Sequence, residues 1–329
     1  MNDLPQNIQQ ILSVIQQSNS FAVVGHIRPD GDCIGSQLAM TGMLRSLGKN
    51  VVCWNSDETP QKYAFLDVGH WMQKPRPGCE FDCVIAVDCA TVKRLGECES
   101  FIQQRKTLIN IDHHESNSRY GDINWIDAES PSTAELVLKL FNHGRWDITP
   151  DLADSLFTAV STDTGSFQYP STLPSTYYAA GDLVRRGANL GRICEKVYHS
   201  YPLSRVKLLQ YVFNHFKLTY KNQIGYFWLK PSDFARTGCH TNDSEGLIDH
   251  VRAIDTVIVA CLFEEMETSV FRVSLRSKSD RINVNEIAAT FGGGGHVAAA
   301  GARIRGGTPQ LVQRRVLSAI KKAMISANF

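Results

Sequence analysis

Short apolar runs that end in acidic or imidazole side chains alternate with helical segments in the first half of the chain. The run FAVVG spans 21–25, FDCVIAVD spans 81–88 and TLINID spans 107–112. Apolar residues between the first run and VVCW (51–54) recur at helical spacing, and Gly48 marks the end of that predicted helix. Strand and helix repeats of this kind form parallel sheets that are covered on both faces. The pattern therefore predicts an α/β fold.

The length of 329 residues favours two domains over one. We expect an N-terminal domain over residues 1–190 and a helical connector over 191–222. Apolar runs at 224–229, 256–263 and 269–276 predict a second, smaller α/β domain over 223–329. Ligands of parallel sheets bind at the carboxyl ends of the strands, so charged residues at those ends are the first candidates for a functional site.

Composition limits the class of partner. Lys and Arg number 34 against 33 Asp and Glu, so the chain has no strong basic field to attract long nucleic acid. The nine cysteines are scattered without a C-x-x-C pair, which is typical of a protein in a reducing compartment. The sequence has neither a signal peptide pattern nor an apolar run of about 18 residues. We therefore expect a cytoplasmic protein without a membrane span.

The loop after the first predicted strand carries His26, Asp30 and Asp32. Pro29 and Gly31 favour a tight turn, which would bring the three side chains together. Imidazole and carboxylate ligands suit a divalent ion such as Mn²⁺ better than an ion that seeks thiolates. The alternative is an acidic turn in which Asp32 is the N-cap of the next helix.

Asp88 ends the second apolar run, and Asp112, His113 and His114 end the third. Charged groups beside buried strands are costly unless a positive charge compensates them. Asp163 follows a predicted helix at 151–160. Taken singly, these acids are more often turn or cap residues. Together with the first loop they supply two histidines and four aspartates on one side of a sheet, which is what two ions at about 4 Å require.

The ordered motifs His-x-x-x-Asp-x-Asp, strand-end Asp, Asp-His-His and a later Asp resemble those of the DHH phosphoesterases. SLRS (274–277), FGGGGH (291–296) and AAAG (298–301) resemble the DHHA1 domain. The chain is most similar to the short members, the nanoRNases or oligoribonucleases that also act as 3′-phosphoadenosine-5′-phosphate phosphatases. This resemblance implies a parallel-sheet DHH catalytic domain, a smaller α/β DHHA1 domain that binds the substrate, and a cleft between them.

The resemblance also implies a ligand set for two ions, which we expect to be Mn²⁺ with Mg²⁺ or Co²⁺ as substitutes. One ion would be bound by His26, Asp30 and Asp88, and the other by Asp32, Asp88, His113 and Asp163. A water shared by the ions would be the nucleophile. His114 would face the scissile phosphate, and Asp112 would orient the histidines from behind.

The second domain would bind the substrate through a glycine-rich segment and arginines. Glycines let backbone N–H groups approach a phosphate closely, and an arginine binds phosphate oxygens bidentately. Arg252 is as readily part of a surface salt bridge. The candidates are Arg276, Ser277, Gly293, Gly294, Gly295, His296 and Arg252.

Four further residues lie close to the motifs in sequence. Ser132 and Thr133 could contact the site, but we favour a role at the N-cap of the helix predicted at 132–141. Arg28 and Arg119 adjoin the motifs, and the sequence does not fix the direction of their side chains.

The main functional prediction is hydrolysis of very short oligonucleotides to nucleoside 5′-monophosphates, and of 3′-phosphoadenosine-5′-phosphate to AMP. One alternative of the same class is a phosphodiesterase for linear or cyclic dinucleotides of the pApA type. An alternative of another class is a nucleotide-binding sensor without turnover. The expected partner is a short oligonucleotide or nucleotide, and the sequence leaves a homodimer open.

Overall fold

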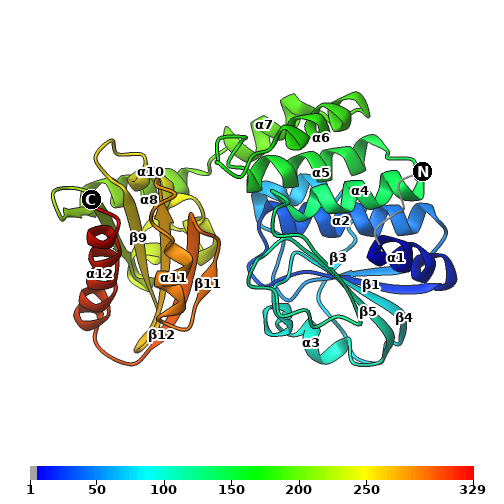
Figure 1. Ribbon diagram of the computed structural model, residues 1–329, viewed down its shortest axis with the longest axis horizontal. Helices are drawn as coiled ribbons and strands as arrows, with labels where there is room; N and C mark the ends of the chain where they lie inside the picture. Colours follow the sequence, from blue (N-terminus) through cyan, green and yellow to red (C-terminus); the bar gives the residue numbers. More distant parts are fainter. Residues whose placement is uncertain (1–5) are drawn as a thin grey trace. The chain divides into compact units, whose positions relative to one another are not determined.

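In a computed structural model, which describes residues 6–329, the chain forms two compact units, Met1–Ser200 and Tyr201–Phe329 (Figure 1). Each unit has a six-stranded sheet with helices packed on it. The predicted α/β class, with a parallel sheet in the larger N-terminal part and a smaller C-terminal α/β part, is confirmed. No helix among the described residues is both long and apolar enough to cross a membrane.

The sheet of the first unit is parallel throughout, with the strand order β3-β2-β1-β4-β5-β6. Its strands are β1 (Ser20–Val24), β2 (Asn50–Trp54), β3 (Met72–Gln73), β4 (Phe81–Val87), β5 (Arg105–Asp112) and β6 (Ile123–Ile126). The chain leaves β1 toward β2 on one side, and later returns to β4 on the other side of β1. The strand order therefore reverses between β1 and β4, which is the point where parallel sheets bind ligands.

Longer helices cover one face of this sheet and short ones cover the other. The longer helices are α1 (Gln6–Gln17), α2 (Gly31–Ser46), α4 (Thr133–Gly144), α5 (Pro150–Asp163), α6 (Pro174–Arg185) and α7 (Leu190–Tyr198). The short ones on the other face are η2 (Val92–Leu95) and α3 (Cys98–Phe101), whereas the short helix η1 (Gln61–Leu66) packs against α2, α5 and α7 on the first face. Alternate side chains of β1 join two cores, Phe21 and Val23 on the α2 face and Ala22 and Val24 on the α3 face.

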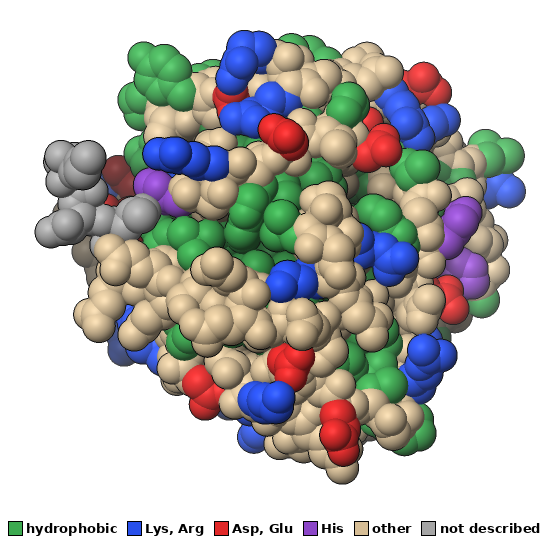
Figure 2. Space-filling view, turned by 90° about the vertical axis from the view of Figure 1, so that its right-hand side faces the viewer, with side chains coloured by type: hydrophobic (Ala, Val, Ile, Leu, Met, Phe, Trp, Pro, Cys, Tyr) green, Lys and Arg blue, Asp and Glu red, His purple; other side chains and the backbone are tan. Residues whose placement is uncertain are grey.

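A cavity of about 450 Å³ opens where α1, α2 and α4 end. Figure 2 shows this face of the first unit, where a hollow has hydrophobic side chains on its floor. Because α2 starts after the carboxyl end of β1, its own end lies at the amino ends of the strands. The cavity is thus far from the strand ends that carry the predicted site. Its lining residues are Leu12, Ile15, Gln16, Leu47, Lys49, His143, Gly144 and Trp146.

The second unit has a mixed sheet in the order β11-β12-β10-β9-β8-β7, in which only the β8–β9 pair is parallel. Its strands are β7 (Lys217–Thr219), β8 (Ile224–Leu229), β9 (Val259–Glu267), β10 (Val270–Ser277), β11 (Gly294–Gly295) and β12 (Ala299–Arg305). Its helices are α8 (Leu203–His215), α9 (Pro231–Thr237), η3 (Thr241–Ser244), α10 (Leu247–Arg252), α11 (Val284–Ala289) and α12 (Pro309–Ser326). Two cores, one on each face, share the alternating side chains of β9.

α2 is the central helix of the first unit, because every residue from Gly31 to Leu44 is buried. It lies between the sheet and α5, which packs across it (Figure 1). Gly35 makes this close approach possible, since a Cβ there would meet the Ser155 carbonyl oxygen and lie 2.8 Å from the Ala159 Cβ. The first turn of α2 is therefore fixed by its packing against α5.

We expect Gly35→Ala to lower the free energy of unfolding by about 1–3 kcal/mol, because the added methyl group overpacks the α2–α5 contact. Urea denaturation measures this change. Gly181→Ala is the matched control, since Gly181 is also helical but has nothing within 4 Å of its added Cβ. That variant should be neutral or more stable by about 0.5–1 kcal/mol. Equal effects at both positions would contradict the packing argument.

Candidate metal centre

The charged residues predicted from the sequence gather at the carboxyl ends of β1, β4 and β5 and at two helix ends. His26 follows β1, Asp88 follows β4, and His113 follows β5. Asp32 lies in the first turn of α2. Asp163 is the last residue of α5, which runs three residues beyond the predicted helix. The reversal of strand order between β1 and β4 therefore places side chains from distant parts of the sequence side by side.

Asp88 is the centre of the cluster. Its Oδ2 lies 3.3 Å from Nε2 of His26, and its Oδ1 lies 3.6 Å from Nε2 of His113. One buried carboxylate thus faces two imidazoles through opposite oxygens. Its backbone is left-handed, with φ at 52°, a conformation that non-glycine residues adopt rarely. This conformation turns the chain sharply at the end of β4.

The first half of the cluster is the group around His26, Asp30 and Asp88. His26 directs into it a ring nitrogen that has no hydrogen-bond partner. Its Nδ1 lies 2.8 Å from the carbonyl oxygen of Ile27, which can only accept, so Nδ1 carries the proton. Nε2 is buried and has no hydrogen-bond partner. Ligand atoms of His26, Asp88 and Cys33 lie within 4.8 Å of one another. A histidine with its other nitrogen tied to a carbonyl is oriented as metal ligands usually are.

Asp30 lies at the edge of this group, with Oδ1 3.8 Å from Nε2 of His26. The same oxygen accepts a hydrogen bond from the backbone N–H of Cys33, at 3.1 Å. Asp30 is therefore the N-cap of α2. The alternative in which Asp32 is the N-cap is wrong, because Asp32 already lies inside the helix.

His113, Asp32 and Asp163 form the second half of the cluster. Nε2 of His113 lies 3.2 Å from Asp163 and 3.8 Å from Asp32. Its Nδ1 lies 3.0 Å from the carbonyl oxygen of Ser130, which orients this ring as Ile27 orients His26. The ligand atoms of the three residues lie within 4.8 Å of one another.

The N-terminus of α4 holds the carboxylate of Asp32. The backbone N–H groups of Thr133 and Ala134 donate to its two oxygens at 2.6 and 3.0 Å. The hydroxyl of Ser36 donates to Oδ1 at 3.1 Å. The hydroxyl of Thr133 also donates to Oδ1 of Asp88, at 3.1 Å. A helix N-terminus stabilises an anion through its free N–H groups and its dipole.

The charge balance of the cluster favours binding of a cation. Burial, and then the charges of neighbouring acids, raise the pKa of Asp32 and of Asp163 well above the usual range. Burial acts to lower the pKa of His113, yet the facing acids outweigh it and raise that pKa. Several acids are thus crowded into a buried space with few positive charges. Imidazole nitrogens and carboxylate oxygens with this charge fit a divalent metal ion.

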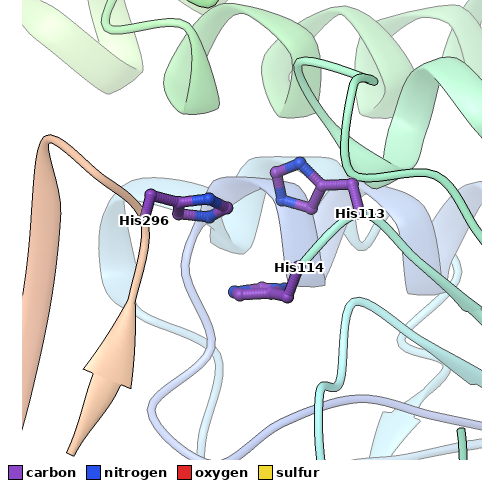
Figure 3. Close-up of side chains that lie close together, drawn as sticks. All are labelled: His113, His114 and His296. Carbon is purple, nitrogen blue, oxygen red and sulfur yellow. The ribbon is translucent and has the colours of Figure 1, made fainter. Parts of the chain in front are cut away.

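His114 lies next to His113 (Figure 3), and its ligand atom lies within 4.8 Å of those of Asp88 and Asp112. Its ring meets that of His113 edge to face, with the centroids 4.9 Å apart. Its Nδ1 lies 2.8 Å from Oδ1 of Asp112 and 3.6 Å from Oδ1 of Asp88. Its side chain is 13% exposed, against 4% for His113, so His114 is the more accessible of the two.

In the second unit, Arg252 and Arg276 lie around one carboxylate, that of Asp249. Nη2 of Arg252 lies 3.2 Å from Oδ1 of Asp249, and Nε of Arg276 lies 4.0 Å from the same oxygen. The salt bridge considered for Arg252 is therefore present. Ser277 is buried, and its hydroxyl donates to the carbonyl of Ser279 at 2.9 Å.

The glycine run before His296 is partly structural. Gly292 has a positive φ of 74°. A Cβ on Gly293 would meet the carbonyl oxygen of Gly301, and one on Gly295 would meet β12. A Cβ on Gly294 would lie 3.7 Å from the Asn285 side chain, an ordinary contact. The backbone N–H of His296 donates to the carbonyl of Ala299 at 2.8 Å, which closes the turn between β11 and β12.

The sequence favoured a helix N-cap role for both Ser132 and Thr133. The structure bears this out for Ser132 only. Ser132 is the N-cap of α4, and its hydroxyl accepts from the N–H of Glu135 at 3.3 Å. Thr133 contacts the candidate metal ligands Asp32 and Asp88 through its N–H group and its hydroxyl. The capping-box pattern S-x-x-E predicts the first role. Only the fold shows that this helix points at Asp32.

Known protein families match both units. The profile of the DHH family N-terminal domain matches residues 20–160, and that of the DHHA1 domain matches residues 223–325. The chain therefore contains a DHH domain followed by a DHHA1 domain. The prediction of these two domains from the ordered motifs is thus confirmed, and the residues clustered around Asp88, except Asp163, lie within the DHH match.

Similar proteins match nearly the whole length of this chain. The bifunctional oligoribonuclease and PAP phosphatase NrnA of Thermus thermophilus is 29% identical, over 98% of this chain and 95% of its own length. The protein of the same name from Bacillus subtilis is 27% identical, over 90% and 92%. The crystal structure of an exopolyphosphatase-related protein from Bacteroides fragilis is 26% identical, with a TM-score of 0.88 over all of both chains.

We expect Mn²⁺ or Mg²⁺ to raise the melting temperature, because ions that bind only the folded state stabilise it, by about 2.7 kcal/mol at roughly 100 times Kd. Asp88→Ala should remove most of this rise, which thermal denaturation with and without EDTA measures. Asp82→Ala is the control at the opposite end of β4, where Asp82 pairs with Lys106. That variant should keep the rise. An undiminished rise in Asp88→Ala would exclude a shared ligand.

Proposed function

We propose that this DHH protein is a two-metal phosphoesterase that hydrolyses very short oligonucleotides to nucleoside 5′-monophosphates, and 3′-phosphoadenosine-5′-phosphate to AMP. The position of Asp88 between His26 and His113 is the observation that carries the proposal, because a carboxylate facing two ligand groups is suited to bridge two ions. The names of relatives along nearly the whole chain contain both activities that the motifs predicted.

The proposed metal is Mn²⁺, and the proposed ligands are those predicted from the motifs. One ion would be held by His26, Asp30 and Asp88, and the other by Asp32, Asp88, His113 and Asp163. When bound, the ions would lower the pKa of a shared water and neutralise charge on the phosphoryl oxygens. The mixture of two imidazoles with carboxylates supports Mn²⁺ over Mg²⁺, which prefers oxygen ligands.

The protein's own groups would orient the reaction. Thr133 and the N-terminus of α4 hold Asp32 and Asp88 in place, so that few side chains need to move during the reaction. Asp112 accepts from Nδ1 of His114, which leaves Nε2 to act on the substrate. Nε2 of His114 would then face a phosphate oxygen or the leaving oxygen.

The second unit would bind the substrate, with Arg276 on a phosphate. Gly294 is the residue of the glycine run that the packing of β11 does not require, so it is the best candidate for close approach of a ligand. A net charge of +1 suits a substrate of a few nucleotides better than a long strand. All nine cysteines are free, which supports the predicted reducing cytoplasm as the site of action.

We expect the protein with Mn²⁺ to release mononucleotides from a 5′-phosphorylated RNA dinucleotide and phosphate from 3′-phosphoadenosine-5′-phosphate. It should hydrolyse pyrophosphate and a 20-mer far more slowly. Asp88→Ala should reduce turnover to below a few per cent, because it removes a ligand of both ions. Chromatography of the products measures each rate.

The same assay separates the alternatives. Activity on pApA or a cyclic dinucleotide alone would favour the dinucleotide phosphodiesterase. Activity on the 20-mer at the dinucleotide rate would indicate an exonuclease. Binding of nucleotide and metal without hydrolysis of any substrate would make the protein a sensor and refute the proposal.

Arg276→Ala should raise KM about tenfold or more with little change in kcat, because a charge-assisted hydrogen bond to phosphate is made in both ground and transition states. Steady-state kinetics on the dinucleotide measure both constants. Arg303→Ala is the matched control, since Arg303 is an exposed arginine on β12, the neighbour of β10. A defect confined to kcat would contradict a binding role.

A further inference from the structure

Asp112 has a second partner besides His114, and that partner lies in the loop after β5. The side-chain amide of Asn117 donates to Oδ2 of Asp112 at 2.5 Å, while His114 donates to Oδ1. Asp112 is completely buried. Its two oxygens are therefore held from opposite sides, and the carboxylate cannot rotate without losing one of these bonds.

The orientation of the Asn117 amide is fixed by its surroundings. Besides Asp112, its Nδ2 faces Oδ1 of Asn110 at 2.8 Å and the carbonyl of Cys89 at 3.3 Å. Asn110 in turn donates to the carbonyls of Ala86 and Cys89, so its Oδ1 is an acceptor. Only the NH₂ group of Asn117 can face these three acceptors.

The other end of the Asn117 side chain shapes the loop. Its Oδ1 accepts from the N–H of Arg119 at 2.6 Å, and Arg119 has a left-handed backbone with φ at 52°. The N–H of Asn117 donates to the carbonyl of His114, at 3.1 Å. Asn117 therefore connects the loop of the histidine pair with the segment that follows Asp88.

We propose that Asn117 is a positioning residue, which holds Asp112 against Nδ1 of His114 and so keeps Nε2 of His114 directed to the substrate. The inference rests on the proposed function for its effect on turnover. Without the amide, Asp112 would keep one partner and gain freedom to rotate. His114 would then lose its single tautomer, although the ligands of the metal cluster would stay in place.

Two variants separate positioning from simple space-filling. Asn117→Ala removes the amide, and Asn117→Asp keeps its size but places an acceptor opposite Asp112 and Asn110. We expect both to lower kcat about 10–100-fold, the usual cost of losing a partner behind an active-site ligand. KM and the number of bound ions per chain should stay within about twofold of wild type.

A matched asparagine and a double variant complete the kinetic test. Asn124→Ala should keep wild-type kcat, because the side chain of Asn124 hydrogen-bonds to the backbone of Gly121, away from Asp112 and His114. Asp112→Asn combined with Asn117→Ala should be no slower than Asp112→Asn alone, since Asn117 acts through Asp112. Near-normal kcat in Asn117→Asp, parallel loss of metal, or additive defects would overturn the proposal.

A spectroscopic measurement tests the same point without turnover. Long-range ¹H–¹⁵N spectra of the Mg²⁺-loaded protein should show the Nδ1–H tautomer of His114 in the wild type and a mixture in both Asn117 variants. An unchanged His114 signal would refute the positioning role. If the wild type hydrolyses no substrate, the proposed function fails, while the spectra still decide the role of Asn117.

Discussion

The mutual repulsion of buried carboxylates around Asp88 is the constraint on which the first unit depends. Asp32, Asp88 and Asp112 are almost fully buried, and Asp163 adds a fourth charge. Without compensation this arrangement would cost several kcal/mol. The fold supplies part of the compensation itself, through the N–H groups of α4 on Asp32 and the imidazoles around Asp88. The repulsion that these groups leave uncompensated is the electrostatic reason for the cluster to bind divalent cations.

The packing of the helices maintains this arrangement. α2 is buried on all sides, so its first turn cannot move to relieve the repulsion between acids. Gly35 lets α5 approach closely, and α5 carries Asp163 at its end. The left-handed backbone of Asp88 is kept for the same reason, because the surrounding packing and hydrogen bonds determine its position. The strained backbone of Asp88 and the packing of α2 against α5 thus both maintain the geometry of the same cluster.

Sequence periodicity was sufficient to predict the class of fold, the strand ends and the residues that gather there. The reason is that parallel strands end on one edge, so a charged residue after each apolar run is placed by the fold class alone. Thr133 and Asn117 could not be found in this way. From the sequence alone, Thr133 is interpreted as part of a helix cap and Asn117 as an ordinary polar loop residue. Their roles depend on which helix end and which loop face the cluster, and only tertiary packing determines this.

The same distinction applies to the second unit. A run of four glycines reads as a phosphate loop, yet Gly293 and Gly295 are required by the close pairing of β11 with β12, and Gly292 by its left-handed backbone. Gly294 is the glycine of this run for which neither packing nor backbone conformation gives a structural reason, so it is the best candidate for close approach of a ligand. Asp249 similarly changes the interpretation of the arginines, because Arg252 already has its salt bridge at 3.2 Å while Arg276 is more loosely held at 4.0 Å. Arg276 also donates to the carbonyl of Leu275 at 3.0 Å, but its longer distance from Asp249 makes it the better candidate of the two for binding a phosphate.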